Sequence, residues 1–117
     1  MRNSPTLSRH LAAGLVAAAA LAAAPSALAT APVDCFREVF ATLDLGTDAR
    51  VALCAGATSG APVDCYNAGR TQISVDKPTL VRLCNGATST APVDCWREGH
   101  DHLSITPDQL VALCRAR

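Results

Sequence analysis

The pentapeptide that opens each unit of this chain occurs three times without change, as Ala31-Pro32-Val33-Asp34-Cys35, Ala61-Pro62-Val63-Asp64-Cys65 and Ala91-Pro92-Val93-Asp94-Cys95. The period is 30 residues. It continues into the second half of each unit, in the segments Val51-Ala52-Leu53-Cys54, Val81-Arg82-Leu83-Cys84 and Val111-Ala112-Leu113-Cys114. Self-similarity at a fixed period is typical of repeat architectures. We therefore predict three tandem copies, at about residues 30–59, 60–89 and 90–117.

Each copy contains two cysteines, and together they are Cys35, Cys54, Cys65, Cys84, Cys95 and Cys114. An even number of cysteines in a short exported chain predicts a disulfide framework, although many connectivities are open. Pairing within copies produces three identical bridges, Cys35–Cys54, Cys65–Cys84 and Cys95–Cys114. Pairing across the shorter gaps leaves Cys35 and Cys114 in need of a long-range partner. The repeat therefore favours pairing within each copy.

Local signals predict two helices in each copy. Proline is tolerated in the first turn of a helix, and an aspartate there interacts favourably with the helix dipole, so the pentapeptide predicts a helix start. We expect this first helix to be short, because Gly69 and Gly99 follow four residues after their cysteines, where the first copy has Val39. Nothing in the sequence explains why the first copy has a valine where the other two copies have a glycine.

The second helix of each copy is expected to begin near Thr47, Asp76 or Thr106 and to end at Gly56 or Gly86 in the first two copies. Thr106 is the clearest start, since a threonine cap is followed by proline and, three residues on, by glutamine. In an antiparallel hairpin the start of the first helix lies beside the end of the second. The two cysteines of each copy occupy those places.

The predicted fold is all-α: three tandem disulfide-stapled helical hairpins, arranged as a small solenoid or a compact bundle. Two short helices bury too little apolar surface to be stable alone. A disulfide that closes a loop of this size contributes about 3 kcal/mol. Stacking of neighbouring hairpins would supply the remaining stability.

The first 29 residues are predicted to be a secretory signal peptide. A basic start containing Arg2 and Arg9 is followed by an uncharged apolar run, Leu11 to Ala24, and by the small-residue pattern Ala27-Leu28-Ala29. The run has 14 residues, whereas a membrane-spanning helix needs roughly 20. We expect a mature chain that starts at Thr30, is secreted or periplasmic, and has no membrane span once the signal is removed. The alanine-rich signal favours a bacterial origin.

Charge and motifs argue against several function classes. The residues after Ala29 carry slightly more acidic than basic side chains, without a basic stripe, so nucleic acid is not an expected partner. His100-Asp101-His102 is the one cluster that resembles metal ligands, and we interpret it as a solvated loop between helices. Neither a cofactor nor a metal is expected. No hydrolase elbow, zincin motif or phosphate loop occurs, so we expect no enzymatic activity.

One aromatic residue follows the first cysteine of every copy: Phe36, Tyr66 and Trp96. These rings form a candidate contact surface for a partner, since Tyr and Trp are favoured at interfaces. The favoured alternative is that they pack between neighbouring hairpins, because small stapled cores need large side chains.

The expected role is a non-catalytic interaction or structural module that binds another envelope or extracellular protein. The alternative is a small secreted inhibitor or toxin-like effector, since stapled scaffolds resist proteases.

Overall fold

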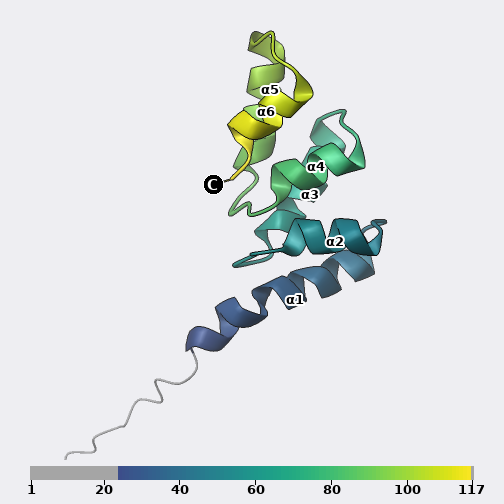
Figure 1. Ribbon diagram of the computed structural model, residues 1–117, viewed down its shortest axis with the longest axis vertical. Coiled ribbons are helices and arrows are strands. Elements are labelled where there is room, and N and C mark those ends of the chain that lie inside the picture. The colour runs from purple at the N-terminus through teal and green to yellow at the C-terminus, as the bar shows by residue number, and fades with distance from the viewer. Residues whose placement is uncertain (1–23, 117) are drawn as a thin grey trace, which may run out of the picture.

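The computed structural model describes residues 24–116, with side chains from residue 29 onward. Residues 1–23, which make up most of the predicted signal peptide, lie outside this range. The described part contains six helices and no strand: α1 Ala24–Thr42, α2 Thr47–Cys54, α3 Ala61–Gln72, α4 Lys77–Cys84, α5 Ala91–His102 and α6 Pro107–Cys114. Successive helices pair into three hairpins, which confirms the predicted all-α fold (Figure 1).

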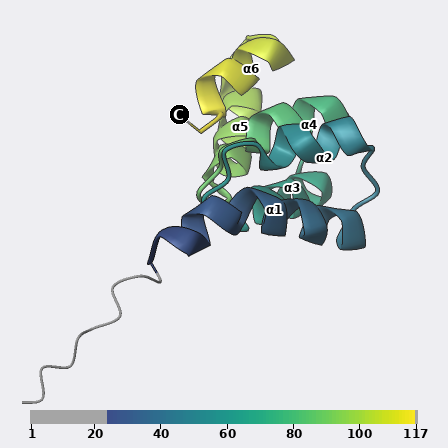
Figure 2. The ribbon, with the colours of Figure 1, turned by 60° about the horizontal axis from the view of Figure 1, so that its bottom comes forward.

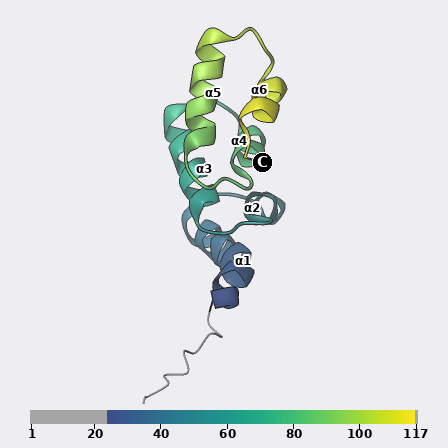
Figure 3. The ribbon, with the colours of Figure 1, turned by 90° about the vertical axis from the view of Figure 1, so that its left-hand side faces the viewer.

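The hairpins are stacked in chain order. The second helices α2, α4 and α6 contact one another in series along one side, and α1, α3 and α5 do so along the other (Figure 3). Within the described residues no helix of the first hairpin contacts a helix of the third. This nearest-neighbour pattern is that of a solenoid, and it decides between the two arrangements that the sequence left open.

All three disulfides link cysteines of the same copy: Cys35–Cys54, Cys65–Cys84 and Cys95–Cys114. Each joins the first helix of a hairpin to the last residue of its second helix, with the two Cα atoms 5.5–5.6 Å apart. That separation is usual for a disulfide. The predicted within-copy pairing is confirmed, and three intrachain disulfides in a chain this short indicate an oxidising compartment.

The second helices begin and end where the sequence predicts. At α4 the Asp76 carboxylate accepts a hydrogen bond from the Thr79 backbone N–H at 2.9 Å. At α6 Thr106 and Gln109 form a reciprocal capping box. After α2 and α4 the chain reverses at Gly56 and Gly86, whose φ angles of 70° and 72° lie in the left-handed region that favours glycine.

The first helices of copies two and three begin at the predicted alanine-proline step. Ser59 and Ser89 hold these starts, since each hydroxyl accepts a hydrogen bond from the alanine N–H two residues on, at 3.2 and 3.1 Å. The first copy differs: α1 begins at Ala24, so Pro32 lies inside the helix (Figure 2). The predicted helix start at Pro32 is therefore wrong, because helix-favouring alanines precede it in place of a serine-containing turn.

The expectation that the first helices are short is also wrong. α3 and α5 have 12 residues each and continue through Gly69 and Gly99, both of which are buried. A Cβ at Gly69 would overlap the Leu80 side chain, whose Cγ lies 3.2 Å from that position, and a Cβ at Gly99 would lie 2.5 Å from a methyl carbon of Leu110. The glycines therefore allow two helices to approach closely rather than ending a helix.

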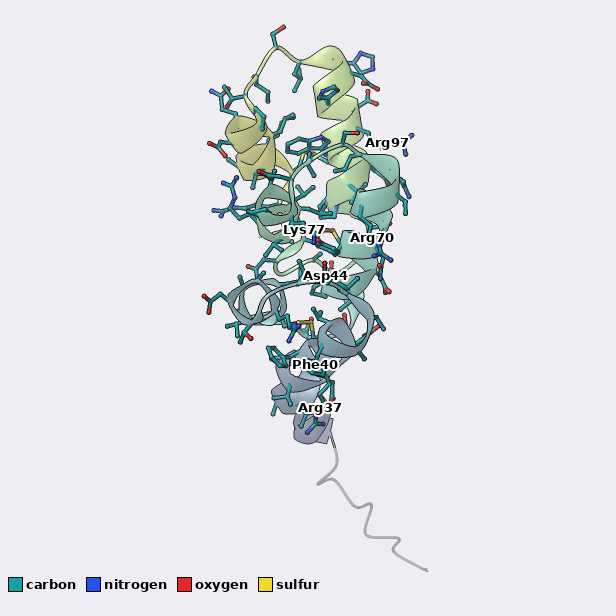
Figure 4. All side chains as sticks on the ribbon, turned by 90° about the vertical axis from the view of Figure 1, so that its right-hand side faces the viewer. Arg37, Phe40, Asp44, Arg70, Lys77 and Arg97 are labelled. Atoms are coloured by element: carbon teal, nitrogen blue, oxygen red, sulfur yellow. A yellow bond between two sulfur atoms is a disulfide. The ribbon has the colours of Figure 1, made fainter. Side chains whose placement is uncertain are left out.

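Polar contacts connect neighbouring hairpins at their edges. Between the first two, Lys77 Nζ donates to the Asp44 carbonyl at 3.0 Å and pairs with its carboxylate at 3.3 Å (Figure 4). Asn85 Nδ2 also donates to the carbonyls of Ala52 and Ala55, at 2.7 and 3.0 Å. Between the last two hairpins the contacts are Arg97 with Gln72 at 3.2 Å and Arg82 with Asp108 at 2.9 Å. Most of these groups are exposed, so they set the register more than the stability.

None of the helices in residues 24–116 has both the length and the apolar character needed to cross a bilayer.

Candidate functional site

The first hairpin, formed by α1 and α2, lies at one end of the stack (Figure 1). Several of its apolar side chains are exposed. We call this apolar surface the leading face and define it by Val33, Phe36, Phe40 and Val51. The three α1 residues follow the spacing of one helix side. A shallow groove of about 270 Å³ on this face is lined by Pro32, Val33, Phe36, Val51, Cys54 and Ala55. Its lining is almost entirely apolar, so the groove fits a hydrophobic side chain better than a charged ligand.

Two valines of the leading face are exposed because of their position in the array. Val51 is 54% exposed, whereas its counterparts Val81 and Val111 are 4% exposed. The valine of the pentapeptide shows the same difference, with 51% exposure at Val33 and 0% at Val63 and Val93. In copies two and three these positions are buried in a stack where a hairpin precedes them. Within residues 24–116, no hairpin precedes the first copy.

The aromatic residues after the first cysteines do not form one contact surface. Tyr66 and Trp96 are buried in the core, where burial also raises the pKa of the Tyr66 hydroxyl. The interpretation of these two rings as a contact surface is therefore wrong, and the packing alternative describes them. Phe36 is half-buried and lines the groove of the leading face, so the structure places only this ring where a partner can contact it.

The first hairpin carries an exposed aromatic residue at a position where the other two copies are polar. Phe40 is two-thirds exposed at a position where the next copies carry Arg70 and His100. The guanidinium carbon of Arg50 lies 4.6 Å from the centroid of the Phe40 ring, which is the geometry of a cation–π contact. Arg50 thus holds the ring on the surface, and Figure 4 shows Phe40 within the first hairpin.

A second apolar surface lies at the opposite end of the stack, on the third hairpin. We call it the trailing face and define it by Leu103, Ile105 and Leu113, all of which are exposed. Leu113 is 55% exposed, whereas its counterparts Leu53 and Leu83 are fully buried. Leucine at this position is therefore covered only where another hairpin follows.

The histidine pair belongs to a helix and not to a loop as predicted. His100 and His102 lie in the last turn of α5, where His100 Nδ1 is 3.5 Å from Asp101 and His102 Nε2 is 3.4 Å from Glu98. Among the described residues no group of three or more His, Cys, Asp or Glu side chains converges on a metal-sized position. These exposed pairs contribute little to stability.

No protein-family model, curated protein or solved structure is significantly similar to this chain. Sequence reasoning missed Val33, Val51 and Leu113, because these residues are identical in all three copies. The available signal was their place in the array: terminal repeats of a solenoid usually replace apolar residues on the outer side with polar ones, and these do not.

Proposed function

We propose that this protein is a non-catalytic interaction module, secreted or periplasmic, that binds another protein through the leading face of its first hairpin. The observation that carries the proposal is the exposure of Val33, Phe40 and Val51 beside the half-buried Phe36, on a disulfide-stapled scaffold. Contiguous exposed apolar surface of this kind marks interaction sites in soluble proteins. A rigid scaffold also lowers the entropic cost of binding.

The compartment is inferred from two independent features. The disulfides need an oxidising environment to form and persist. The predicted signal peptide at residues 1–29 supplies a route to that environment, and its alanine-rich composition supports a bacterial source. The partner is accordingly expected among envelope or extracellular proteins, and neither a nucleic acid nor a cofactor enters the proposal.

The test is affinity capture from the envelope fraction of the source organism with three forms of the chain. Val51→Arg places a charge in the groove, while the matched control Ala41→Arg places the same charge on an exposed position of α1 outside the leading face. The wild type and Ala41→Arg should retain the same defined partner, and Val51→Arg should lose it. Equal retention by all three forms, or no retention by the wild type, would show the proposal to be wrong.

The inhibitor or toxin-like alternative predicts a different result. Purified chain would then inhibit a protease or the growth of a target cell at low concentration. A positive result that depends on Val51 would identify the bound protein as a target rather than a structural partner.

A further inference from the structure

We propose that the chain associates head to tail with a second copy of itself, with the leading face of one molecule docking on the trailing face of the next. The inference rests on the proposed function, because it names the partner of the same leading face. Its basis is the repeat. The joint, meaning the interface between two neighbouring hairpins, exists twice within each molecule, and the contact between two molecules would reproduce it.

The leading half of that joint is present in every copy. Inside the stack, Val81 and Val111 are almost fully buried, each in a hairpin that follows another. Val51 occupies the same position on α2 and is half exposed. The first hairpin therefore presents a surface whose two counterparts are both buried within the chain.

The trailing half is equally complete. In the first copy Leu43, Leu45 and Leu53 are nearly or fully buried, and their counterparts in the third copy are the exposed Leu103, Ile105 and Leu113. In the second copy, which another hairpin also follows, Leu83 is fully buried and Ile73 and Val75 are half-buried. Leu53 and Val51 are two residues apart on one short helix, and so project toward opposite sides of the hairpin. Each hairpin thus has a leading and a trailing side, and the molecule leaves one of each open.

The absence of polar caps favours this occupant over others. Terminal repeats of a solenoid normally carry a polar outer side, which prevents further stacking. Here the first hairpin keeps the apolar Val33 and Val51 on its outer side, and it also carries the exposed Phe40 where the later copies have the exposed Arg70 and His100. The trailing face keeps three exposed aliphatic residues.

The edge contacts decide how strong the joint is. Within the chain, Lys77 forms an ion pair with Asp44, but the matching residues in a contact between two molecules are Thr47 and Ser104, which carry no charge. Asn85, which donates hydrogen bonds to the preceding hairpin, is matched by Ala55, which has no polar side chain. A joint between molecules therefore keeps its apolar centre and loses these polar contacts, so it should be weaker than the joint within the chain and reversible. Because the two surfaces differ, the contact is heterologous and can continue from molecule to molecule.

The test uses sedimentation equilibrium of the oxidised full chain, purified from an oxidising compartment. The N-terminus is determined by mass spectrometry, since the turns of α1 before Ala31 lie at the same end as the leading face (Figure 1). The wild type and the control Ala41→Arg should form oligomers whose average mass rises continuously with concentration, up to about 1 mM. Val51→Arg and Leu113→Arg, which each alter an exposed residue of one face, should each remain monomeric.

The deciding sample is an equimolar mixture of Val51→Arg and Leu113→Arg. One variant keeps an intact trailing face and the other an intact leading face, so the mixture should form a dimer of twice the monomer mass and nothing larger. A monomeric wild type, a monomeric mixture, or dimers of either variant alone would overturn the proposal. Under those results the proposed function still stands if Val51→Arg loses an envelope partner that Ala41→Arg retains, so the two failures are distinguishable.

Discussion

Where the two helices of each hairpin approach most closely, the first copy differs from the other two at a matched pair of positions. The first copy has Val39 on α1 and Arg50 on α2, whereas the second has Gly69 with Leu80 and the third has Gly99 with Leu110. Both glycines leave room for a leucine that is 2% exposed. In the first hairpin the fully buried Val39 supplies the apolar volume from the other helix, and the Arg50 guanidinium lies over Phe40.

In every hairpin one buried apolar side chain fills the space between the helices, supplied by the first helix in the first copy and by the second helix in the other two. A glycine inside a helix costs about 1 kcal/mol relative to alanine. Burial of a leucine side chain contributes roughly 1.5–3 kcal/mol, which more than offsets that cost. Because Val39 fills this space in the first hairpin, position 50 carries an arginine in place of the leucine. The Arg50 guanidinium packs on the exposed Phe40 ring of the leading face.

Loss of the bridges is expected to have the largest effect on all three hairpins. Each bridge contributes about 3 kcal/mol, against a total stability of about 5–15 kcal/mol for a typical domain. Excess dithiothreitol should therefore abolish the cooperative thermal transition measured by circular dichroism. An unchanged melt would contradict this.

Under limited reduction the three disulfides should open in an order set by their exposure to the reducing thiol. Cys95 is half-buried, whereas Cys65 and Cys84 are fully buried. Thiol access should make Cys95–Cys114 the first bridge to open and Cys65–Cys84 the last. Alkylation followed by mass spectrometry measures the order, and simultaneous opening of all three would show that access does not decide it.

The substitution Val39→Gly gives the first hairpin the glycine that the other two hairpins have, but not the leucine that packs against it. It should destabilise the chain by about 3 kcal/mol, because it combines a core cavity with a glycine in a helix. Adding Arg50→Leu should recover part of the loss. Urea unfolding measures both, and a double variant no more stable than Val39→Gly would refute the compensation.

The converse change, Gly69→Val, places a side chain where Leu80 already lies. Overpacking should cost about 2 kcal/mol. In a Leu80→Ala background the same substitution should instead stabilise, since it fills a cavity, so the double-mutant cycle should show a coupling of at least about 1 kcal/mol. Additive effects would mean that the two residues do not share the space.

The smallest expected effect concerns the helix caps. The N-cap residue of α2 is Gly46, which has no side-chain hydrogen bond, whereas the N-cap residue of α4 is Asp76, whose side chain accepts one. Hydrogen bonding from Thr79 lowers the pKa of Asp76 below its ordinary value. The stabilisation is therefore present above the ordinary pKa and is lost as the pH falls through the lowered one. Asp76→Gly should shift the urea midpoint slightly at pH 7 and less at about pH 2. A pH-independent difference would exclude the carboxylate as its source.

The amino-acid sequence by itself determined what depends on neighbours along the chain. The repeat and the pairing of cysteines within each copy were predicted from the spacing of identical residues. The N-caps of α4 and α6 at Asp76 and Thr106 and the reversals at Gly56 and Gly86 follow from local backbone chemistry. Capping and left-handed turns involve only a few consecutive residues, so a pattern of residue types is enough to predict them.

The tertiary structure alone decided the rest. Gly69 lies inside α3 and does not end it. A glycine stands there because the Leu80 side chain of another helix occupies the space that a Cβ would need. Val51 and Val81 each begin a Val-x-Leu-Cys segment at the end of a second helix, yet one is half exposed and the other buried. Their difference comes from the presence or absence of a preceding hairpin, and burial depends on such long-range packing, which no local pattern encodes.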